Sequence, residues 1–224
     1  MYIYDPTIIL LIPAIILGIW AQARVSRSFR KYSKVPSGTG MTGAQAARRV
    51  LDRNGLTDVG IETIPGRLTD HYDPRAKVLR LSAAVAENAS LAAVGVATHE
   101  AGHALQDKDG YMPMRIRHTL VPVANLGSQL LWPLVIGGFF MGWGILLQIG
   151  IVLYGAAVLF HIVTLPVEFN ASSRALASLT SEGILVPDEV KGARKVLSAA
   201  AMTYVASTLA AILTLVRLIL LSRR

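Results

Sequence analysis

The stretch Thr98–His103 contains the residues best suited to chemistry in this 224-residue chain. It reads T-H-E-A-G-H, so His99 and His103 are four positions apart and Glu100 follows the first histidine. On a helix this spacing places both imidazoles on one face, one turn apart, where they can bind one metal ion beside a carboxylate. We therefore expect His99 and His103 to be zinc ligands and Glu100 to act as a general base toward the attacking water.

A catalytic zinc site needs a third protein ligand and an open position for water. The chain contains no cysteine, so a histidine or a carboxylate must supply that ligand. We expect it to be Glu168, in the segment L-P-V-E-F-N-A-S that follows a long uncharged stretch. One zinc ion would then have two histidines and one glutamate as ligands, a standard set for zinc hydrolases.

Other residues remain as rivals for the third ligand. Asp109 takes the place of the last histidine in the extended pattern H-E-x-x-H-x-x-G-x-x-H, but Gln106 replaces the glycine that lets the chain turn back. His118 lies close to the start of a membrane span, and His71 lies in a loop of unknown placement. Mutating Glu168, Asp109 and His71 separately and measuring bound zinc would distinguish them.

The elements that must position these side chains belong to a membrane protein. The chain is 53% hydrophobic and 16% charged, its mean hydropathy is +0.49, and it contains apolar runs long enough to cross a bilayer. The net charge of +8 could indicate a nucleic-acid partner. However, the basic residues cluster beside the apolar runs and no nucleic-acid-binding motif is present, so we expect a lipid bilayer and no nucleic acid as partner.

Residues 1–23 are expected to form a retained transmembrane anchor. In a signal peptide basic residues precede the apolar run, whereas here they follow it. Five basic residues come directly after this anchor: Arg24, Arg27, Arg30, Lys31 and Lys34. By the positive-inside rule they place the next segment in the cytoplasm. We expect residues 24–118 to form a cytoplasmic zinc-peptidase region.

Residues 119–167 contain no Asp, Glu, Lys or Arg. As one helix this stretch would extend about 73 Å, more than twice the roughly 30 Å hydrocarbon core, so the chain must cross the membrane and return. Aromatic residues and glycines at 139–144 suit a turn at the interface. A transmembrane hairpin over 119–166 therefore returns Glu168 to the side that holds the two histidines.

The rest of the chain completes a mainly α, multi-pass protein of the cell membrane. Pro166 suits the first turn of a new helix, which would carry Glu168 within a connection over 167–196. A C-terminal transmembrane helix and tail over 197–224 make a fourth span. The fold class expected is thus about four transmembrane helices with a small α+β peptidase domain.

The cytoplasmic region is expected to contain both helices and strands. Thr42 is the predicted N-cap of a helix that ends near residues 54–55, and the motif helix should extend from about 88–90 to Gln106. Alternating apolar residues at 59–64 and 76–82 predict two strands, paired as a short antiparallel hairpin or small sheet. The polar segment 68–75 is expected to be a loop between them.

These motifs together resemble the YugP-type membrane zinc metallopeptidases, and the architecture is similar to that of the HtpX-like membrane proteases. The resemblance covers nearly the whole chain and rests on the anchor, D-H-Y-D-P at 70–74, T-H-E-A-G-H-A at 98–104, the uncharged hairpin and L-P-V-E-F-N-A-S at 165–172. It implies a gluzincin-like site with His99, His103 and Glu168 on zinc and Glu100 as base. Asn170 stands where aspartate is expected, which puts in doubt one contact behind the ligands.

The predicted function is hydrolysis of peptide bonds near the cytoplasmic membrane face, with peptides or membrane-protein segments as substrates. The developing oxyanion needs a further donor, for which His71, Tyr72 and Arg174 are the polar candidates. The alternative is a zinc-binding membrane scaffold or chaperone partner without proteolysis. The presence of Glu100 beside both histidines favours the enzyme, and the sequence identifies no oligomeric or regulatory partner.

Overall fold

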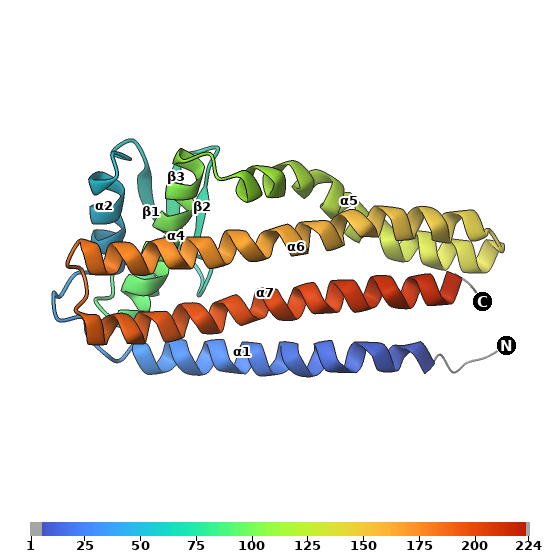
Figure 1. Cartoon of the computed structure of the whole chain (residues 1–224), viewed down its shortest axis with the longest axis horizontal. Helices are drawn as coiled ribbons and strands as arrows, with labels where there is room; N and C mark the ends of the chain where they lie inside the picture. The colour runs from blue at the N-terminus through green and yellow to red at the C-terminus, as the bar shows by residue number, and fades with distance from the viewer. Residues whose placement is uncertain (1–5, 223–224) are drawn as a thin grey trace. The chain divides into compact units, whose positions relative to one another are not determined.

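The structure is a computed structural model that describes residues 6–222, apart from the side chain of Phe139. Its elements, in chain order, are η1 (Pro6–Leu11), α1 (Ile12–Tyr32), α2 (Gly43–Arg53), β1 (Gly60–Ile64), β2 (His71–Asp73), β3 (Val78–Ser82), α3 (Ala83–Ala86), α4 (Leu91–Lys108), α5 (Met112–Met141), α6 (Gly144–Ser181) and α7 (Pro187–Ser222). Figure 1 shows that helices dominate and that the strands form one small sheet. The mainly α fold class is confirmed.

The chain divides into two compact units. The span unit contains residues 1–21, 112–166 and 202–224, and the site unit contains residues 22–111 and 167–201. Helices α1, α6 and α7 each contribute residues to both units. The first five residues and the last two, which belong to the predicted anchor and tail, lie outside the described residues.

Among the described residues, four helices are long and apolar enough to cross a membrane: Pro6–Tyr32, Met112–Gly138, Gly144–Ser181 and Pro187–Ser222. Large apolar side chains on them are exposed, with Ile19 at 68% and Val152 at 75% exposure. Water would disfavour so much apolar surface, whereas hydrocarbon accommodates it. The expected set of four membrane-spanning helices is therefore present.

The predicted turn between the two uncharged spans lies between Met141 and Gly144. Gly142 has a φ of +66°, a left-handed conformation that glycine adopts without steric cost. Close packing of α5 on α6 depends on a second glycine, because a Cβ on Gly127 would lie 2.2 Å from the carbonyl oxygen of Leu153. Small residues thus allow the hairpin to close.

The prediction that Pro166 begins a new helix is wrong. Pro166 lies inside α6, which continues from Gly144 to Ser181. Proline removes one i→i−4 hydrogen bond from a helix, but neighbouring groups can compensate in membrane helices, so a proline there need not end the helix. The helix that contains the second span therefore also carries Glu168.

The small sheet has the strand order β1-β3-β2. Strand β1 pairs with β3 in parallel, from Gly60 opposite Val78, and β2 pairs with β3 antiparallel, with His71 opposite Arg80. Of the two predicted alternatives, the small sheet is confirmed, whereas an antiparallel hairpin of the two longer strands is wrong, because β1 and β3 are parallel. The segment expected to be a loop contains β2, which reverses the chain once more and forms the short hairpin with β3.

The core of the site unit forms where α2 and the sheet pack against α4. Thr42 caps α2 as predicted, because its side chain accepts a hydrogen bond from Gln45 N and the Gln45 side chain accepts one from Thr42 N. Ser90 caps α4 by accepting a hydrogen bond from Ala93 N. Small apolar residues bury α4 on most sides, which makes it a rigid carrier for its polar side chains.

Candidate metal centre

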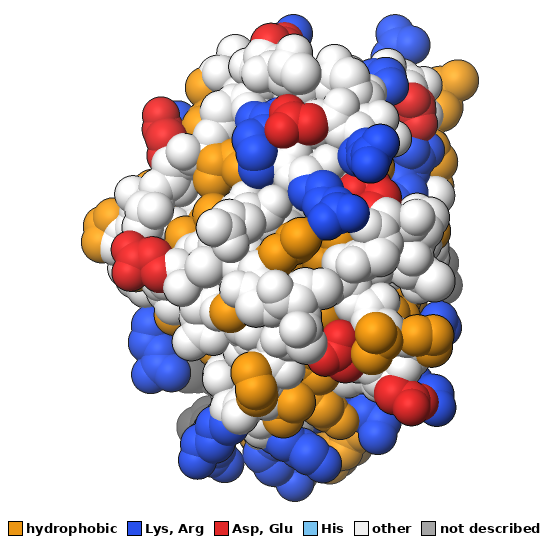
Figure 2. Space-filling model, turned by 90° about the vertical axis from the view of Figure 1, so that its left-hand side faces the viewer, with side chains coloured by type: hydrophobic (Ala, Val, Ile, Leu, Met, Phe, Trp, Pro, Cys, Tyr) orange, Lys and Arg blue, Asp and Glu red, His pale blue; other side chains and the backbone are white. Residues whose placement is uncertain are grey.

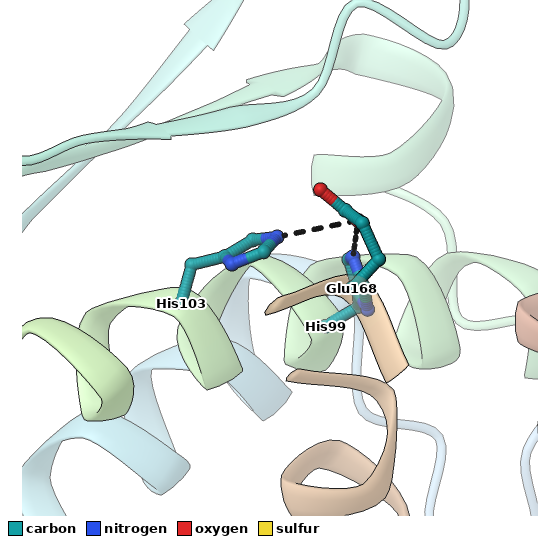
Figure 3. Close-up of side chains that lie close together, drawn as sticks. All are labelled: His99, His103 and Glu168. Atoms are coloured by element: carbon teal, nitrogen blue, oxygen red, sulfur yellow. Dashed lines mark ion pairs between the residues drawn. The ribbon is translucent and has the colours of Figure 1, made fainter. Parts of the chain in front are cut away.

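The two motif histidines lie one turn apart on α4, as their spacing predicts. Their ring centroids are 4.8 Å apart with an interplanar angle of 82°. Figure 3 shows both rings directed toward the same space beside the helix. The side chains of His99 and His103 are 14% and 10% exposed, so this space is screened from solvent.

Glu168 of α6 reaches into the same space and faces both rings (Figure 3). Its Oε2 lies 3.3 Å from His99 Nε2 and 3.6 Å from His103 Nε2, and its side chain is only 3% exposed. The three residues form a group whose ligand atoms all lie within 4.8 Å of one another. The structure thus brings together the three side chains proposed as ligands from the sequence.

The chemistry of these three side chains and the two distances from Glu168 fit zinc. Zinc binds imidazole nitrogen and carboxylate oxygen at about 2.0–2.2 Å, so two ligand atoms of a tetrahedral site lie roughly 3.3–3.6 Å apart. The two distances from Glu168 Oε2 fall in this range. A set of two nitrogens and one oxygen also leaves a tetrahedral position for water, as catalysis requires.

Gln106 fixes the protonation of His103. The side-chain amide of Gln106 is fully buried, and its Nε2 donates to Val167 O at 2.8 Å and to Asn170 Oδ1 at 3.0 Å. Because a carbonyl oxygen can only accept, the nitrogen must face Val167, and Gln106 Oε1 must therefore face His103 Nδ1 at 2.9 Å. His103 then carries a proton on Nδ1, which leaves the Nε2 lone pair available to a metal.

Asn170, which stands where the family resemblance implies aspartate, forms hydrogen bonds behind the ligands. Asn170 Oδ1 accepts hydrogen bonds from Gln106 Nε2 and from Arg174 Nε, the latter at 2.8 Å. Arg174 also pairs with Asp109 at 2.5 Å. Since only the Oδ1 atom of Asn170 is used, an amide serves here as well as the expected carboxylate would.

His99 is held from behind by the same helix that supplies Glu168. Its Nδ1 lies 3.1 Å from Ser172 Oγ, four residues after Glu168 and hence on the same helical face. The backbones of α4 and α6 approach closely here, because a Cβ on Gly102 would lie 2.6 Å from Ala171 O. Sequence reasoning gave neither Gln106 nor Ser172 a role, although the spacing from Glu168 could have indicated Ser172.

Glu100 lies on the same helix and is 8% exposed. Burial lowers the pKa of His103, but its close contact with Glu168 and the negative charges of Glu100 and Glu168 outweigh this effect and raise the pKa overall. The charge of Glu100 therefore acts on the group formed by His103 and Glu168.

The three candidate oxyanion donors each have a partner. The Tyr72 hydroxyl donates to Asp107 at 3.0 Å, and both burial and this hydrogen bond raise the Tyr72 pKa. Exposed His71 has its Nδ1 at 2.8 Å from the Thr69 carbonyl oxygen, which requires a proton on that nitrogen. Arg174 donates a hydrogen bond to Asn170 Oδ1 and forms an ion pair with Asp109.

The rival third ligands lie elsewhere. Asp109 ends α4 as its C-cap residue and pairs with Arg174. His71 is at the start of β2, and His118 belongs to α5 in the span unit. In the described part of the chain, none of the three joins the group formed by His99, His103 and Glu168.

Comparison with known proteins gives two matches that cover nearly the whole chain. The family described as "Putative neutral zinc metallopeptidase" matches residues 7–223. A protein of Bacillus subtilis (strain 168) described as "Putative membrane protease YugP" is 49% identical over 214 residues, which cover 96% of this chain and 95% of that protein. No solved structure matches the chain.

Proposed function

This chain belongs to the family of neutral zinc metallopeptidases, and from this premise we propose that it is a membrane-bound endopeptidase with His99, His103 and Glu168 as ligands of one catalytic zinc ion. The observation that carries the proposal is the convergence of these three side chains, with Glu168 Oε2 at 3.3 Å and 3.6 Å from the Nε2 atoms of His99 and His103. They come from segments that the long uncharged hairpin separates in sequence. An ordinary buried helix would have no reason to face two histidines with a buried carboxylate.

The catalytic work of the chain divides among a few side chains. Zinc, when bound, lowers the pKa of water toward neutrality and polarises the scissile carbonyl. Glu100 accepts the proton of the attacking water and delivers it to the leaving amine. Gln106 and Ser172 hold the two imidazoles with Nε2 toward the site.

The oxyanion donor is a choice among His71, Tyr72 and Arg174. With its Nδ1 proton given to Thr69 O, neutral His71 has no N–H on Nε2, so only its charged form can donate from that nitrogen. Tyr72 would have to leave Asp107, and Arg174 would have to leave Asn170 and Asp109. Variants of each, compared by kcat at saturating substrate, identify the donor as the one whose loss costs about 100-fold or more.

The sheet offers a means to align an extended substrate. Strand β2 is at one end of the strand order, so its backbone pairs on only one side, with β3. It also packs against α4, the helix of the motif. An extended peptide can add to such an edge through main-chain hydrogen bonds, which would bring a scissile bond toward α4.

The side of the membrane that we propose for the site unit follows from the charge pattern around α1. Its last turns and the following residues contain Arg24, Arg27, Arg30, Lys31 and Lys34. The positive-inside rule assigns this end, and with it the site unit, to the cytoplasm. The substrates we propose are therefore peptides and membrane-protein segments near the cytoplasmic face, with no nucleic acid.

The test is the variant Glu100→Gln in purified full-length protein, assayed on casein or a peptide library. Loss of zinc-dependent cleavage with zinc content unchanged is the expected result, because the ligands remain and only the base is removed. Exposed Glu87, at the C-cap of α3, supplies a matched control, and Glu87→Gln should cleave like wild type. If wild-type protein binds zinc but shows no cleavage that Glu100→Gln abolishes, a zinc-binding scaffold becomes the better function.

A further inference from the structure

We propose that a basic hollow beside the end of α1 binds the phosphate group of an anionic phospholipid. The hollow has a volume of about 470 Å³ and lies between the last turns of α1 and the loop that joins β1 to β2. Arg30, Lys34 and Arg67 line it together with Ser26 and Ser33. All of these residues belong to the site unit, and none takes part in the proposed peptidase reaction.

The charge of the hollow is uncompensated. No carboxylate lines it, and within the described chain none of Arg30, Lys34 and Arg67 forms an ion pair. Five other basic residues of the site unit have acidic partners, in the pairs Arg48–Asp52, Lys77–Asp58, Arg80–Asp73, Arg174–Asp109 and Lys191–Asp188. Three like charges around one hollow therefore favour a bound anion. Figure 2 shows Lys and Arg side chains gathered along the lower edge of the face that it draws.

Arg67 distinguishes this hollow from the basic cluster that commonly follows a membrane span. Arg30 and Lys34 directly follow a membrane span, where basic residues are common. Arg67 comes from a separate loop and is brought to them by the fold. The next residue, Leu68, has a φ of +57°, a left-handed conformation that is uncommon for a residue other than glycine.

The apolar lining favours a lipid over a free phosphate ion. Leu68 is 47% exposed on the rim of the hollow, and Phe29 lines its wall. An inorganic anion gains nothing from these side chains, whereas a phospholipid presents glycerol and acyl carbons next to its phosphate. The hollow therefore matches an amphiphile.

The position of the hollow along α1 also suits a lipid headgroup. The apolar part of α1 ends near Ala23, and Ser26 and Arg30 follow on the same helix. At 1.5 Å per residue these two residues lie about 5 Å and 10 Å beyond Ala23. The headgroup layer of each leaflet is roughly 5–8 Å thick, and a long arginine side chain can reach back into it.

Native mass spectrometry of the delipidated full-length protein tests this proposal. The protein is titrated with phosphatidylglycerol, with phosphatidylcholine or with inorganic phosphate. We expect preferential retention of phosphatidylglycerol and a roughly fivefold loss of that retention in Arg67→Gln, since each basic residue near an anionic surface contributes about 1 kcal/mol. Arg67→Lys should retain most of the binding, and zinc content should remain that of wild type.

The control is Arg75→Gln, which removes the same charge from an exposed arginine in the turn between β2 and β3, outside the hollow. It should bind phosphatidylglycerol like wild type. Equal retention of both lipids by wild type, or equal losses in Arg67→Gln and Arg75→Gln, would overturn the proposal. Displacement of the lipid by millimolar inorganic phosphate would assign the hollow to a soluble anion instead. None of these outcomes depends on peptidase activity.

Discussion

Replacing Gln106 with leucine removes the hydrogen bond that holds His103 while keeping a side chain of similar size. His103 Nδ1, Val167 O and Asn170 Oδ1 each lose the partner that the Gln106 amide supplies. Loss of a partner behind a metal-binding histidine typically lowers metal affinity by about 10–100-fold, or about 1.4–2.7 kcal/mol. We expect the zinc affinity of Gln106→Leu to fall within this range, because the ring of His103 can then rotate and change tautomer.

The assay is a competition titration of the purified protein against a zinc chelator, with circular dichroism in the absence of zinc as a check of folding. Asn170→Asp is the matched control, since it keeps the Oδ1 acceptor that Gln106 and Arg174 use. Its zinc affinity should stay close to that of wild type. Wild-type zinc affinity in a folded Gln106→Leu variant would refute the role deduced for Gln106.

Three further predictions concern the same contacts. Ser172→Ala should weaken zinc binding by about tenfold because it frees His99 Nδ1, while Ser173→Ala, which loses only a bond to Phe169 O, should not. Gly102→Ala should lower both the melting temperature and the zinc content, because the added Cβ would lie 2.6 Å from Ala171 O and overpacking costs about 1–3 kcal/mol. The control is Gly155→Ala in α6, where an added Cβ would have no atom within 4 Å, and it should leave both quantities unchanged. Removing the metal with a chelator should lower the melting temperature, and adding Zn²⁺ should restore it. Mg²⁺ should not restore it, because magnesium prefers oxygen ligands. Restoration of the melting temperature by Mg²⁺ would contradict the donor set of His99, His103 and Glu168.

Local patterns were sufficient to predict much of this molecule. The spacing of His99 and His103 requires only a helix, so the positions of the two imidazoles follow from sequence alone. Span length and the absence of charge predicted the hairpin, and counting membrane crossings brought Glu168 to the histidines. These inferences succeed because each depends on a short-range rule or on the thickness of a bilayer.

Features set by tertiary contacts could not be predicted. Strand β2 has three residues, H-Y-D, too few to show an alternating pattern, and its pairing with β3 fixes its conformation. Pro166 looked like a helix start because local rules do not show that a helix continues through it. The roles of Gln106 and Ser172 depend on how α6 is rotated against α4, which the close approach at Gly102 determines.

The insertion of a membrane hairpin between Glu100 and Glu168 has a consequence for how the protein is made. His103 leaves the ribosome 65 residues before Glu168, a delay of roughly 3–13 s at usual rates of synthesis. During that interval the nascent chain has two of the proposed ligands and a base, but no complete site. On the proposed ligand set, the metal site can therefore be completed only after both spans of the hairpin have been synthesised.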